Sequence, residues 1–337
     1  MADLERRPSR SIVILRALQL GDLLCAVPAF RAMRAAWPAA RLTLVGLPWA
    51  RAFVDRFASC LDDFVEFPGW PGLPEREPDR EGWPRCLAAI ASRRPDLALQ
   101  MQGDGSITND LVARFGAAGV AGFVRRGDAP PAPGLFVEYP DDRHEIRRML
   151  ALTAALGVAP RGEHLEFPLS GDDEREAAGL RERLGLAPGS YACLHPGARA
   201  EARRWPPAHF ARVGECLIAR GLDVIVTGDG PLEERLAAEV VAEMEGRARS
   251  VAGRTSLGAL AALVRDARLV ACNDTGLSHV AAAVGTPSVV VFRITEPSRW
   301  APLDSSRHRV VHDGPHAVDE AVTAAAALLA GEASHAA

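Results

Sequence analysis

The segment from Ala271 to Phe292 limits the fold of this chain more narrowly than any other. It opens in an apolar stretch, passes through a turn over residues 273–276 and an Ala-rich helical stretch, and closes in a second apolar run after Pro287. A strand, a helix and a strand in this order predict a βαβ unit, the building block of a parallel sheet. The segment therefore predicts an α/β fold.

The predicted helix of this unit starts among small and polar residues. Asp274 or Thr275 is the expected cap, so the first N–H groups, those of Thr275, Gly276 and Leu277, should point outward at the carboxyl end of the strand. Such a helix start is either an ordinary capped end or an anion-binding site. The segment alone leaves both interpretations open.

The same alternation of apolar runs and helical patterns fills both halves of the 337-residue chain. This length suits two domains of roughly 150 residues each. The stretch over residues 167–172 has the composition of a link between them. We therefore predict two doubly wound, Rossmann-like domains facing a central cleft, over residues 1–170 and 171–337, with the last helix a candidate to pack back on the first domain.

Composition excludes several functional classes. The formal net charge of −4 and a charged fraction of 24% give no general attraction for nucleic acid. The six cysteines stand singly, without metal-ligand spacing, which is typical of core residues in a reducing compartment. No apolar run approaches the roughly 18 residues of a membrane span, and residues 1–10 lead into no signal-type apolar core. We expect a cytoplasmic protein.

In the first half, Asp22 follows the first predicted strand at a turn that carries one glycine, Gly21. The GxGxxG dinucleotide fingerprint is therefore absent. A carboxylate here can cap the following helix, or act as a general base if an acceptor hydroxyl lies within hydrogen-bond reach. Spacing does not decide between these roles. Gln102 and Asp104 follow another strand tip, which should face the same edge of the sheet.

In the second half, three arginines lie between a strand tip and a helix that starts at Trp205. Arginine forks near helix N–H groups would hold a diphosphate without a metal, although a solvated loop is the alternative. Two histidines, one at a strand tip and one a turn into the helix of the βαβ unit, are candidate contacts, but lone histidines are more often structural. These residues are Arg199, Arg203, Arg204, His195 and His279.

Taken in order, the segments resemble the motifs of the heptosyltransferase family, glycosyltransferase family 9. The resemblance covers nearly the whole chain. Any one motif is weak and the ordered set is specific. The motifs are Leu15-Arg16, Leu20 to Leu24, Val27 to Ala29, His195 to Ala198, Arg203 to Pro206, Gly228 to Arg235 and Asn273 to His279.

The resemblance implies a GT-B architecture and inverting, metal-independent transfer from a nucleotide-diphosphate sugar, with no cofactor. Asp22 would be the base. The diphosphate would bind at Arg203, Asp274, Thr275, Gly276 and Leu277, and the nucleoside at Gly228, Asp229, Glu233, Thr255 and Leu257. His195, Gly197, Arg199 and His279 are candidate sugar or phosphate contacts.

Two segments depart from the family pattern. The ribose-binding acidic residue of the family falls near Leu232, which is not acidic; Glu233, Glu234 or Asp229 could substitute. Residues 292–297 differ from the family's usual Gly-Pro-Thr-Asp-Pro form at the edge that contacts the sugar. ADP-heptose is therefore the expected donor, with another base or sugar as the alternative.

The expected acceptor is a phosphorylated glycolipid of the lipopolysaccharide core. Arginines and a histidine of the first half would suit its phosphates, and the Pro- and Trp-rich segment 68–84 is a candidate lid or peripheral membrane contact. The candidate acceptor residues are Gly21, Gln102, Asp104, Arg125, Arg126, His144, Arg147 and Arg148.

Three other functions stay open on the sequence. A nucleotide-sugar epimerase would use a similar two-domain fold, a non-catalytic protein would bind the nucleotide sugar without releasing the sugar, and an NAD dehydrogenase is disfavoured by the missing glycine fingerprint. The sequence predicts neither the linkage formed nor the oligomeric state.

Overall fold

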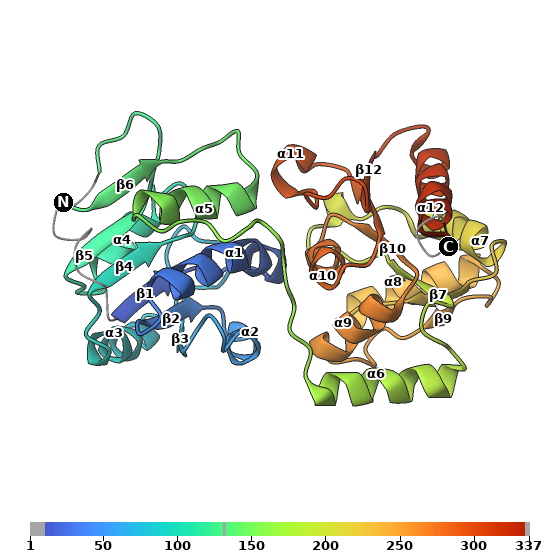
Figure 1. Ribbon diagram of the computed structural model, residues 1–337, viewed down its shortest axis with the longest axis horizontal. Coiled ribbons are helices and arrows are strands. Elements are labelled where there is room, and N and C mark those ends of the chain that lie inside the picture. The colour runs from blue at the N-terminus through green and yellow to red at the C-terminus, as the bar shows by residue number, and fades with distance from the viewer. Residues whose placement is uncertain (1–10, 131–132, 334–337) are drawn as a thin grey trace. The chain divides into compact units, whose positions relative to one another are not determined.

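The computed structural model describes residues 11–130 and 133–333. The chain folds into two compact units, unit 1 up to His164 and unit 2 from Leu165 (Figure 1). Each unit is one six-stranded sheet with helices on both faces, and all strand pairs are parallel. This confirms the prediction of two Rossmann-like α/β domains. The division at residue 164 lies near the predicted boundary at residue 170.

Unit 1 has the strand order β3-β2-β1-β4-β5-β6. Its elements are β1 (Ser11–Leu15), α1 (Leu20–Ala36), β2 (Arg41–Gly46), α2 (Ala50–Arg56), β3 (Asp63–Glu66), α3 (Gly82–Ser92), β4 (Leu97–Gln100), α4 (Thr108–Ala113), β5 (Gly119–Val124), β6 (Leu135–Glu138) and α5 (Glu145–Ala155).

Unit 2 has the order β12-β11-β10-β7-β8-β9. Its elements are α6 (Gly171–Leu184), β7 (Tyr191–His195), the 3-10 turn η1 (Glu201–Arg203), α7 (Pro207–Ile218), β8 (Asp223–Val226), α8 (Gly230–Glu243), β9 (Arg249–Ser250), α9 (Leu257–Asp266), β10 (Leu269–Asn273), α10 (Gly276–Val284), β11 (Ser288–Phe292), α11 (Pro297–Trp300), β12 (His308–His312) and α12 (Ala317–Ala333).

The central strands are buried on both faces, which explains their continuous apolar runs. In β1, Val13 and Leu15 belong to the core shared with α3 and α4, and Ile12 and Ile14 alternate with them and are equally buried. On the other side of this sheet α1 packs against α5. In unit 2 one core joins β7, β8, β10 and β11 to α7, α8 and α12. Helix α12 thus packs within its own unit.

Chain order reverses once in each sheet, between β1 and β4 in unit 1 and between β7 and β10 in unit 2. Beside such a reversal the connections leave in opposite directions, so the carboxyl ends of the two strands open into a crevice where ligands bind. Asp22 follows β1, and Asn273 ends β10. Both motifs that the sequence singled out therefore lie at the switch point of their own unit.

Candidate active site

The tip of β10 is held by the side chain of Asn273, which is fully buried. Its amide oxygen accepts the Trp205 N–H at 2.9 Å, and its amide nitrogen donates to the carbonyls of Pro196 at 2.9 Å and Gly197 at 3.2 Å. One side chain therefore ties the long loop between β7 and α7 to the turn that starts α10. Its motif pointed to a phosphate-binding turn but did not show that Asn273 itself holds the neighbouring loop.

The start of α10 is the predicted anion site. Thr275 occupies the N-cap position, but its side chain forms no capping hydrogen bond with any described residue. The Asp274 carboxylate accepts the Thr295 hydroxyl at 2.6 Å. The N-cap thus falls on one of the two expected residues, but without the side-chain hydrogen bond that a capping threonine usually makes. The Ser278 N–H already donates to the Thr275 carbonyl at 3.0 Å, whereas the N–H groups of Gly276 and Leu277 have no partner inside the helix and suit an anion.

Arg203 lies beside this helix start. Its Nη1 is 3.8 Å from Asp274 Oδ2, too far for a hydrogen bond, and its buried Nε has no partner within residues 11–130 and 133–333. Burial raises the pKa of Asp274, while the Thr295 hydroxyl and the Arg203 guanidinium act to lower it. Arg203 therefore keeps donor capacity for an anion at α10.

His195 ends β7 and is buried beside two polar partners. Its Nδ1 lies 3.0 Å from Thr227 Oγ1, and its Nε2 lies 3.9 Å from Glu233 Oε2. Burial lowers the pKa of His195, and the Glu233 carboxylate and the hydrogen bond with Thr227 only partly oppose this. The imidazole is therefore expected to be neutral near pH 7, as a hydrogen-bonding group rather than a cation.

Glu233 occupies the space left by two glycines. A Cβ on Gly197 would lie 2.3 Å from the Glu233 carboxyl, and one on Gly228 would lie 2.8 Å from the Glu233 Cβ. Glu233 Oε2 also accepts the Asp229 N–H at 2.9 Å. The two predicted contact glycines thus make room for this acid. Glu233, which follows the apolar Leu232 in the chain, is the carboxylate that lies beside His195.

The remaining predicted contacts of unit 2 differ in exposure. Thr255 is partly buried just before α9, and Leu257, at the start of α9, is 37% exposed, an apolar surface that suits a nucleobase. Arg199 is exposed, whereas His279 is 3% exposed and meets Trp300 edge-on with ring centroids 6.3 Å apart. His279 therefore packs beneath the helix start.

In unit 1, Asp22 is the third residue of α1 and is partly buried. The N-cap residue is Gln19, whose N–H lies 3.3 Å from Asp22 Oδ2 in a capping box. This is a long hydrogen bond, so a helix-start role and a base role are compatible. Arg16 Nε and Nη2 hold the Asp22 carbonyl at 2.9 and 2.7 Å.

Gln102 follows β4 and therefore lies on the other side of the switch point of unit 1 from the β1 end. Its Oε1 accepts the Ala17 N–H at 2.8 Å, and its Nε2 is buried without a partner among the described residues. A buried donor without a partner is costly in a folded protein. Gln102 therefore stays the strongest of the predicted acceptor contacts.

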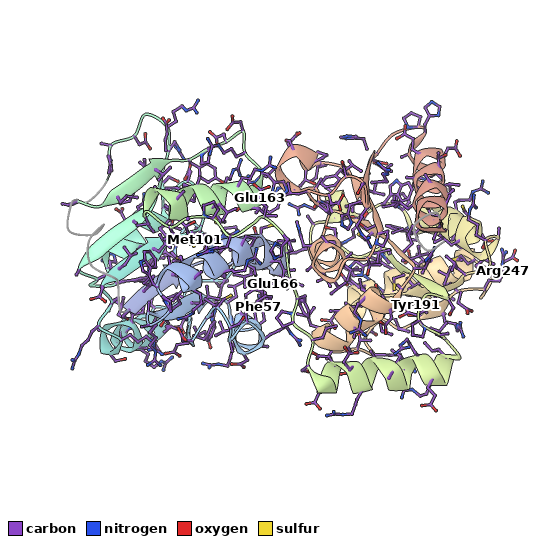
Figure 2. The ribbon with its side chains drawn as sticks, in the orientation of Figure 1. Phe57, Met101, Glu163, Glu166, Tyr191 and Arg247 are labelled. Atoms are coloured by element: carbon purple, nitrogen blue, oxygen red, sulfur yellow. The ribbon has the colours of Figure 1, made fainter. Side chains whose placement is uncertain are left out.

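Most other predicted acceptor residues are engaged within unit 1. Asp104 pairs with Arg125 at 2.9 Å, and Arg147 pairs with Glu163, labelled in Figure 2, at 2.9 Å. His144 is the N-cap of α5 and accepts a backbone N–H with its ring. Arg126 and Arg148 also have carboxylate partners. These contacts give the residues structural roles that the sequence did not reveal.

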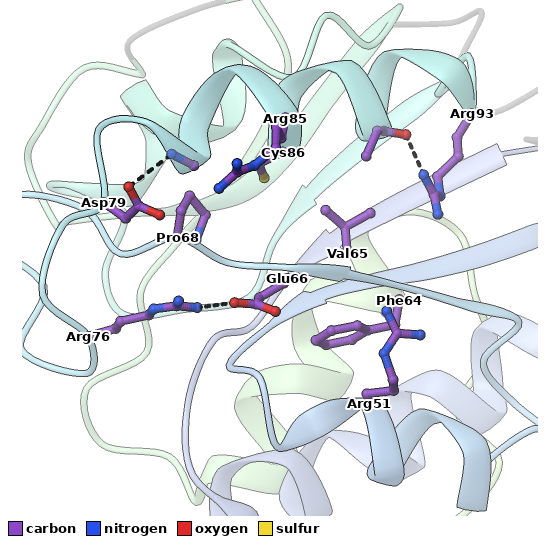
Figure 3. A pocket seen from close by; sticks show the side chains of 12 residues that line it. Arg51, Phe64, Val65, Glu66, Pro68, Arg76, Asp79, Arg85, Cys86 and Arg93 are labelled. Atoms are coloured by element: carbon purple, nitrogen blue, oxygen red, sulfur yellow. Dashed lines mark hydrogen bonds and ion pairs between the residues drawn. The ribbon is translucent and has the colours of Figure 1, made fainter.

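A pocket of about 390 Å³ lies beside β3, α2 and α3 (Figure 3). Of the four arginines that line it, two are paired with carboxylates: Arg76 with Glu66 and Arg93 with Asp63. Arg51 rests on the Phe64 ring at 4.9 Å. Neither Arg51 nor Arg85 pairs with a carboxylate in the described part of the chain. Neither arginine was among the predicted acceptor contacts.

The Pro- and Trp-rich segment forms one wall of this pocket. Trp70 and Trp83 meet edge-on with ring centroids 5.1 Å apart, and Trp83 Nε1 donates to the Gly69 carbonyl at 2.9 Å. Both rings pack on the core of unit 1. The two tryptophans thus stabilise their own unit, and a lid or membrane role of the segment stays a prediction.

Across residues 11–130 and 133–333, no helix is long and apolar enough to cross a membrane. Over the same ranges, no three His, Cys, Asp or Glu side chains gather as a metal site would need.

Comparison with known proteins identifies the family. The family model of glycosyltransferase family 9 (heptosyltransferase) matches residues 88–326. The chain belongs to this family. The resemblance seen in the motifs is thereby confirmed, and the protein is a glycosyltransferase.

Three relatives illustrate the range of similarity within glycosyltransferase family 9. The chain is 33% identical to lipooligosaccharide heptosyltransferase 2 of Haemophilus influenzae over 135 residues, which cover 39% of this chain and 37% of that protein. It is 25% identical to lipopolysaccharide heptosyltransferase 2 of Escherichia coli over 89% of this chain and 87% of that protein. The solved structure of E. coli ADP-heptose lps heptosyltransferase II has a TM-score of 0.76, with 20% identity over 96% of this chain and 99% of that chain.

The last likeness shows a shared fold over nearly the whole chain, so the GT-B prediction is confirmed. In each of the two motif regions of this family 9 member, a buried side chain holds the backbone in place. Asn273 and Arg16 each bind backbone carbonyls at a switch point, a role that their motifs alone did not show.

Proposed function

We propose that the protein transfers a heptose-type sugar from a nucleotide-diphosphate donor to a hydroxyl of a lipopolysaccharide-core glycolipid, with inversion at the anomeric carbon. The observation that carries the proposal is the pair of switch-point sites. Asp22 supplies a carboxylate in unit 1, and Arg203 with the start of α10 supplies an anion site in unit 2.

In this proposal Asp22 accepts the proton of the acceptor hydroxyl as its oxygen attacks the anomeric carbon. The bond between that carbon and the diphosphate oxygen breaks, and the nucleoside diphosphate leaves with both electrons. Arg203 and the N–H groups of α10 stabilise the charge that grows on the leaving group. We assign this stabilisation to the protein alone, so treatment with EDTA should leave the turnover unchanged.

The Asp22→Asn variant tests the base assignment. Loss of a positioned general base should lower kcat by about 10² to 10⁴ fold, while donor binding by calorimetry stays unchanged. Asp110→Asn, at an exposed carboxylate on α4, is the matched control and should keep wild-type turnover. A kcat of Asp22→Asn within a few-fold of wild type would contradict the mechanism.

ADP is the nucleotide we propose for the donor. The E. coli relative of known structure carries ADP-heptose in its name. In this chain, Leu257 offers an exposed apolar surface at the start of α9, and Glu233 is the candidate for binding the ribose. A calorimetric panel of ADP-, GDP-, UDP- and CMP-sugars should give the tightest binding to the ADP-sugar. Glu233→Gln should weaken binding of ADP-heptose and of ADP alone to a similar extent.

For the acceptor, we propose that an anionic group binds in the pocket of Figure 3. Arg51 lies in the first turn of α2, the helix after β2, and Arg85 lies in the first turn of α3, the helix after β3. Both therefore lie toward the sheet edge that carries Asp22. Both guanidinium groups lack carboxylate partners among the described residues, unlike Arg125 and Arg147.

The acceptor assignment predicts a selective kinetic defect. The Arg51→Gln/Arg85→Gln double variant should raise KM for a phosphorylated core glycolipid by about tenfold or more, because each lost charge-assisted hydrogen bond is worth roughly 1.5 to 3 kcal/mol. KM for the donor should not change. Arg125→Gln is the control, since Arg125 already pairs with Asp104. Equal acceptor KM values in all variants would exclude this pocket.

A further inference from the structure

A buried arginine holds the turn that carries Asp22. Arg16 directly follows β1 and has no exposed surface. Its Nε and Nη2 both donate to the Asp22 carbonyl, at 2.9 and 2.7 Å. Its Nη1 donates to the carbonyl of Met101, labelled in Figure 2, which follows β4. The guanidinium therefore joins the two strand ends that border the switch point of unit 1.

The charge of Arg16 is balanced by an equally buried carboxylate. Arg16 Nη2 lies 3.1 Å from Glu145 Oε1, and Arg148 Nη1 lies 3.2 Å from Glu145 Oε2. The side chains of the three residues are 0%, 4% and 2% exposed. The triad places α5 against the start of α1, and these two helices pack together.

The two arginines of this triad have different surroundings. Arg148 donates to the Pro140 carbonyl at 2.8 Å and to the Tyr139 hydroxyl at 3.0 Å, and it stacks on the Tyr139 ring. These contacts involve the loop before α5 and do not reach Asp22. Arg16, in contrast, donates two hydrogen bonds to the Asp22 carbonyl. Arg148 is therefore a matched control for Arg16, because both arginines pair with Glu145.

A buried ion cluster is poor evidence for stabilisation in itself, because desolvation of the charges can exceed their attraction. Fixing a geometry is a better-supported reason to keep it. The planar guanidinium binds one carbonyl through two N–H groups in a rigid fork, which a lysine ammonium cannot reproduce. Since Asp22 lies in the first turn of α1, fixing its carbonyl also fixes the direction of the Cα–Cβ bond from which its carboxylate projects.

We propose that Arg16 is a positioning residue for Asp22, which it holds in the orientation for proton abstraction while Glu145 compensates its charge. The proposal rests on the proposed function, in which Asp22 is the general base. It assigns no contact with substrate to Arg16. A displacement of about 1 Å at a catalytic group can cost roughly 10²-fold in rate, so the anchor should appear in kcat.

The experiment compares Arg16→Lys, Arg148→Lys and Glu145→Gln in the full-length protein. Hydrogen exchange of the peptide covering residues 17–24 should be faster in Arg16→Lys and unchanged in Arg148→Lys. With ADP-heptose and a phosphorylated lipopolysaccharide-core glycolipid, Arg16→Lys should lower kcat by about 10 to 100 fold without changing KM for the donor. Glu145→Gln keeps both bonds to the Asp22 carbonyl and should retain most of kcat even if its melting temperature falls.

The Asp22→Asn background separates this proposal from the proposed function. If Arg16 acts through Asp22, Arg16→Lys should have little further effect on kcat in that background. If Asp22→Asn itself keeps full turnover, the base assignment fails, and the exchange data still decide whether Arg16 anchors the turn. Unchanged exchange in Arg16→Lys, or equal effects of Arg16→Lys and Arg148→Lys on exchange and kcat, would overturn the positioning role.

Discussion

At the residue scale, single buried polar side chains hold the backbone of the candidate site. Asn273 uses both ends of its amide to bind three backbone groups from the loop that carries Arg203. A residue of the same shape but without the donor cannot satisfy the two carbonyls. These carbonyls are buried, so loss of their donor would destabilise the protein, because a buried acceptor without a partner costs its full desolvation free energy.

Asn273→Asp should therefore lower the free energy of unfolding by about 2 to 4 kcal/mol, since a carboxylate would face the Pro196 and Gly197 carbonyls. Donor affinity should fall as well, because the Arg203 loop loses its anchor. Urea unfolding and calorimetry with ADP measure the two effects. Thr286→Ser, at another buried polar residue of this unit, is the control and should keep wild-type ADP affinity.

His308 predicts a pH dependence of stability. Burial lowers its pKa to about 4, with Asp304 opposing and Arg307 adding to the shift, and its Nδ1 lies 2.8 Å from Ser288 Oγ. Between pH 6.5 and 4 the unfolded chain binds the His308 proton more readily than the folded protein does. The stabilisation that comes from neutral, buried His308 is therefore complete above pH 6.5 and is lost as the pH falls toward 4.

The loss should reach about 3 kcal/mol at most. Urea unfolding of the wild type and of His308→Gln at several pH values measures it. The variant should show the shallower fall in the free energy of unfolding between pH 6.5 and 4. Parallel curves for the two proteins would show that His308 does not titrate in this range.

At the element scale, two glycines shape the loop between β4 and α4, which carries predicted acceptor residues. Gly103 and Gly105 both have positive φ, 68° and 86°. A Cβ on Gly105 would lie 2.2 Å from the Phe123 carbonyl oxygen, whereas one on Gly103 would meet nothing within 4 Å in the described part of the chain. The two glycines share a conformation and differ in the space around them.

Gly105→Ala should therefore destabilise the protein by about 3 kcal/mol or more, because backbone strain adds to a clash with backbone atoms. Gly103→Ala should cost only about 1 kcal/mol, the strain alone. Thermal unfolding of the two variants, side by side, measures the difference. Similar losses in both would mean that the loop relaxes around the added Cβ.

At the scale of the whole molecule, the two units carry different parts of the candidate site. The nucleotide contacts that we propose all lie in unit 2. Saturation with ADP at 100 times its Kd should stabilise the state that binds it by about 2.7 kcal/mol. In hydrogen exchange, ADP should protect the segments after β7, β8 and β10 and leave the amides of β1 to β5 unchanged. Protection centred on unit 1 would contradict the assignment of donor binding to unit 2.

The sequence by itself predicted most of the alternation of strands and helices in both units. Buried parallel strands such as β1 and β10 are continuous apolar runs, and their glycine- and Asp-containing turns mark the ends. It was less informative for α4 and for the edge strands β6 and β12. The edge strands are partly exposed and lack a continuous apolar signal, and α4 is a six-residue helix.

The residues of the candidate site also differ in whether the sequence or only the tertiary structure reveals them. Asp22, Arg203 and the turn before α10 stand out in the sequence because their neighbours in the chain define a strand end and a helix start. The partners that hold them come from distant segments: Arg16 meets Glu145, and Asn273 meets Trp205. Only the tertiary structure decides such pairs, because a buried charge or amide finds its partner through packing and not through spacing along the chain.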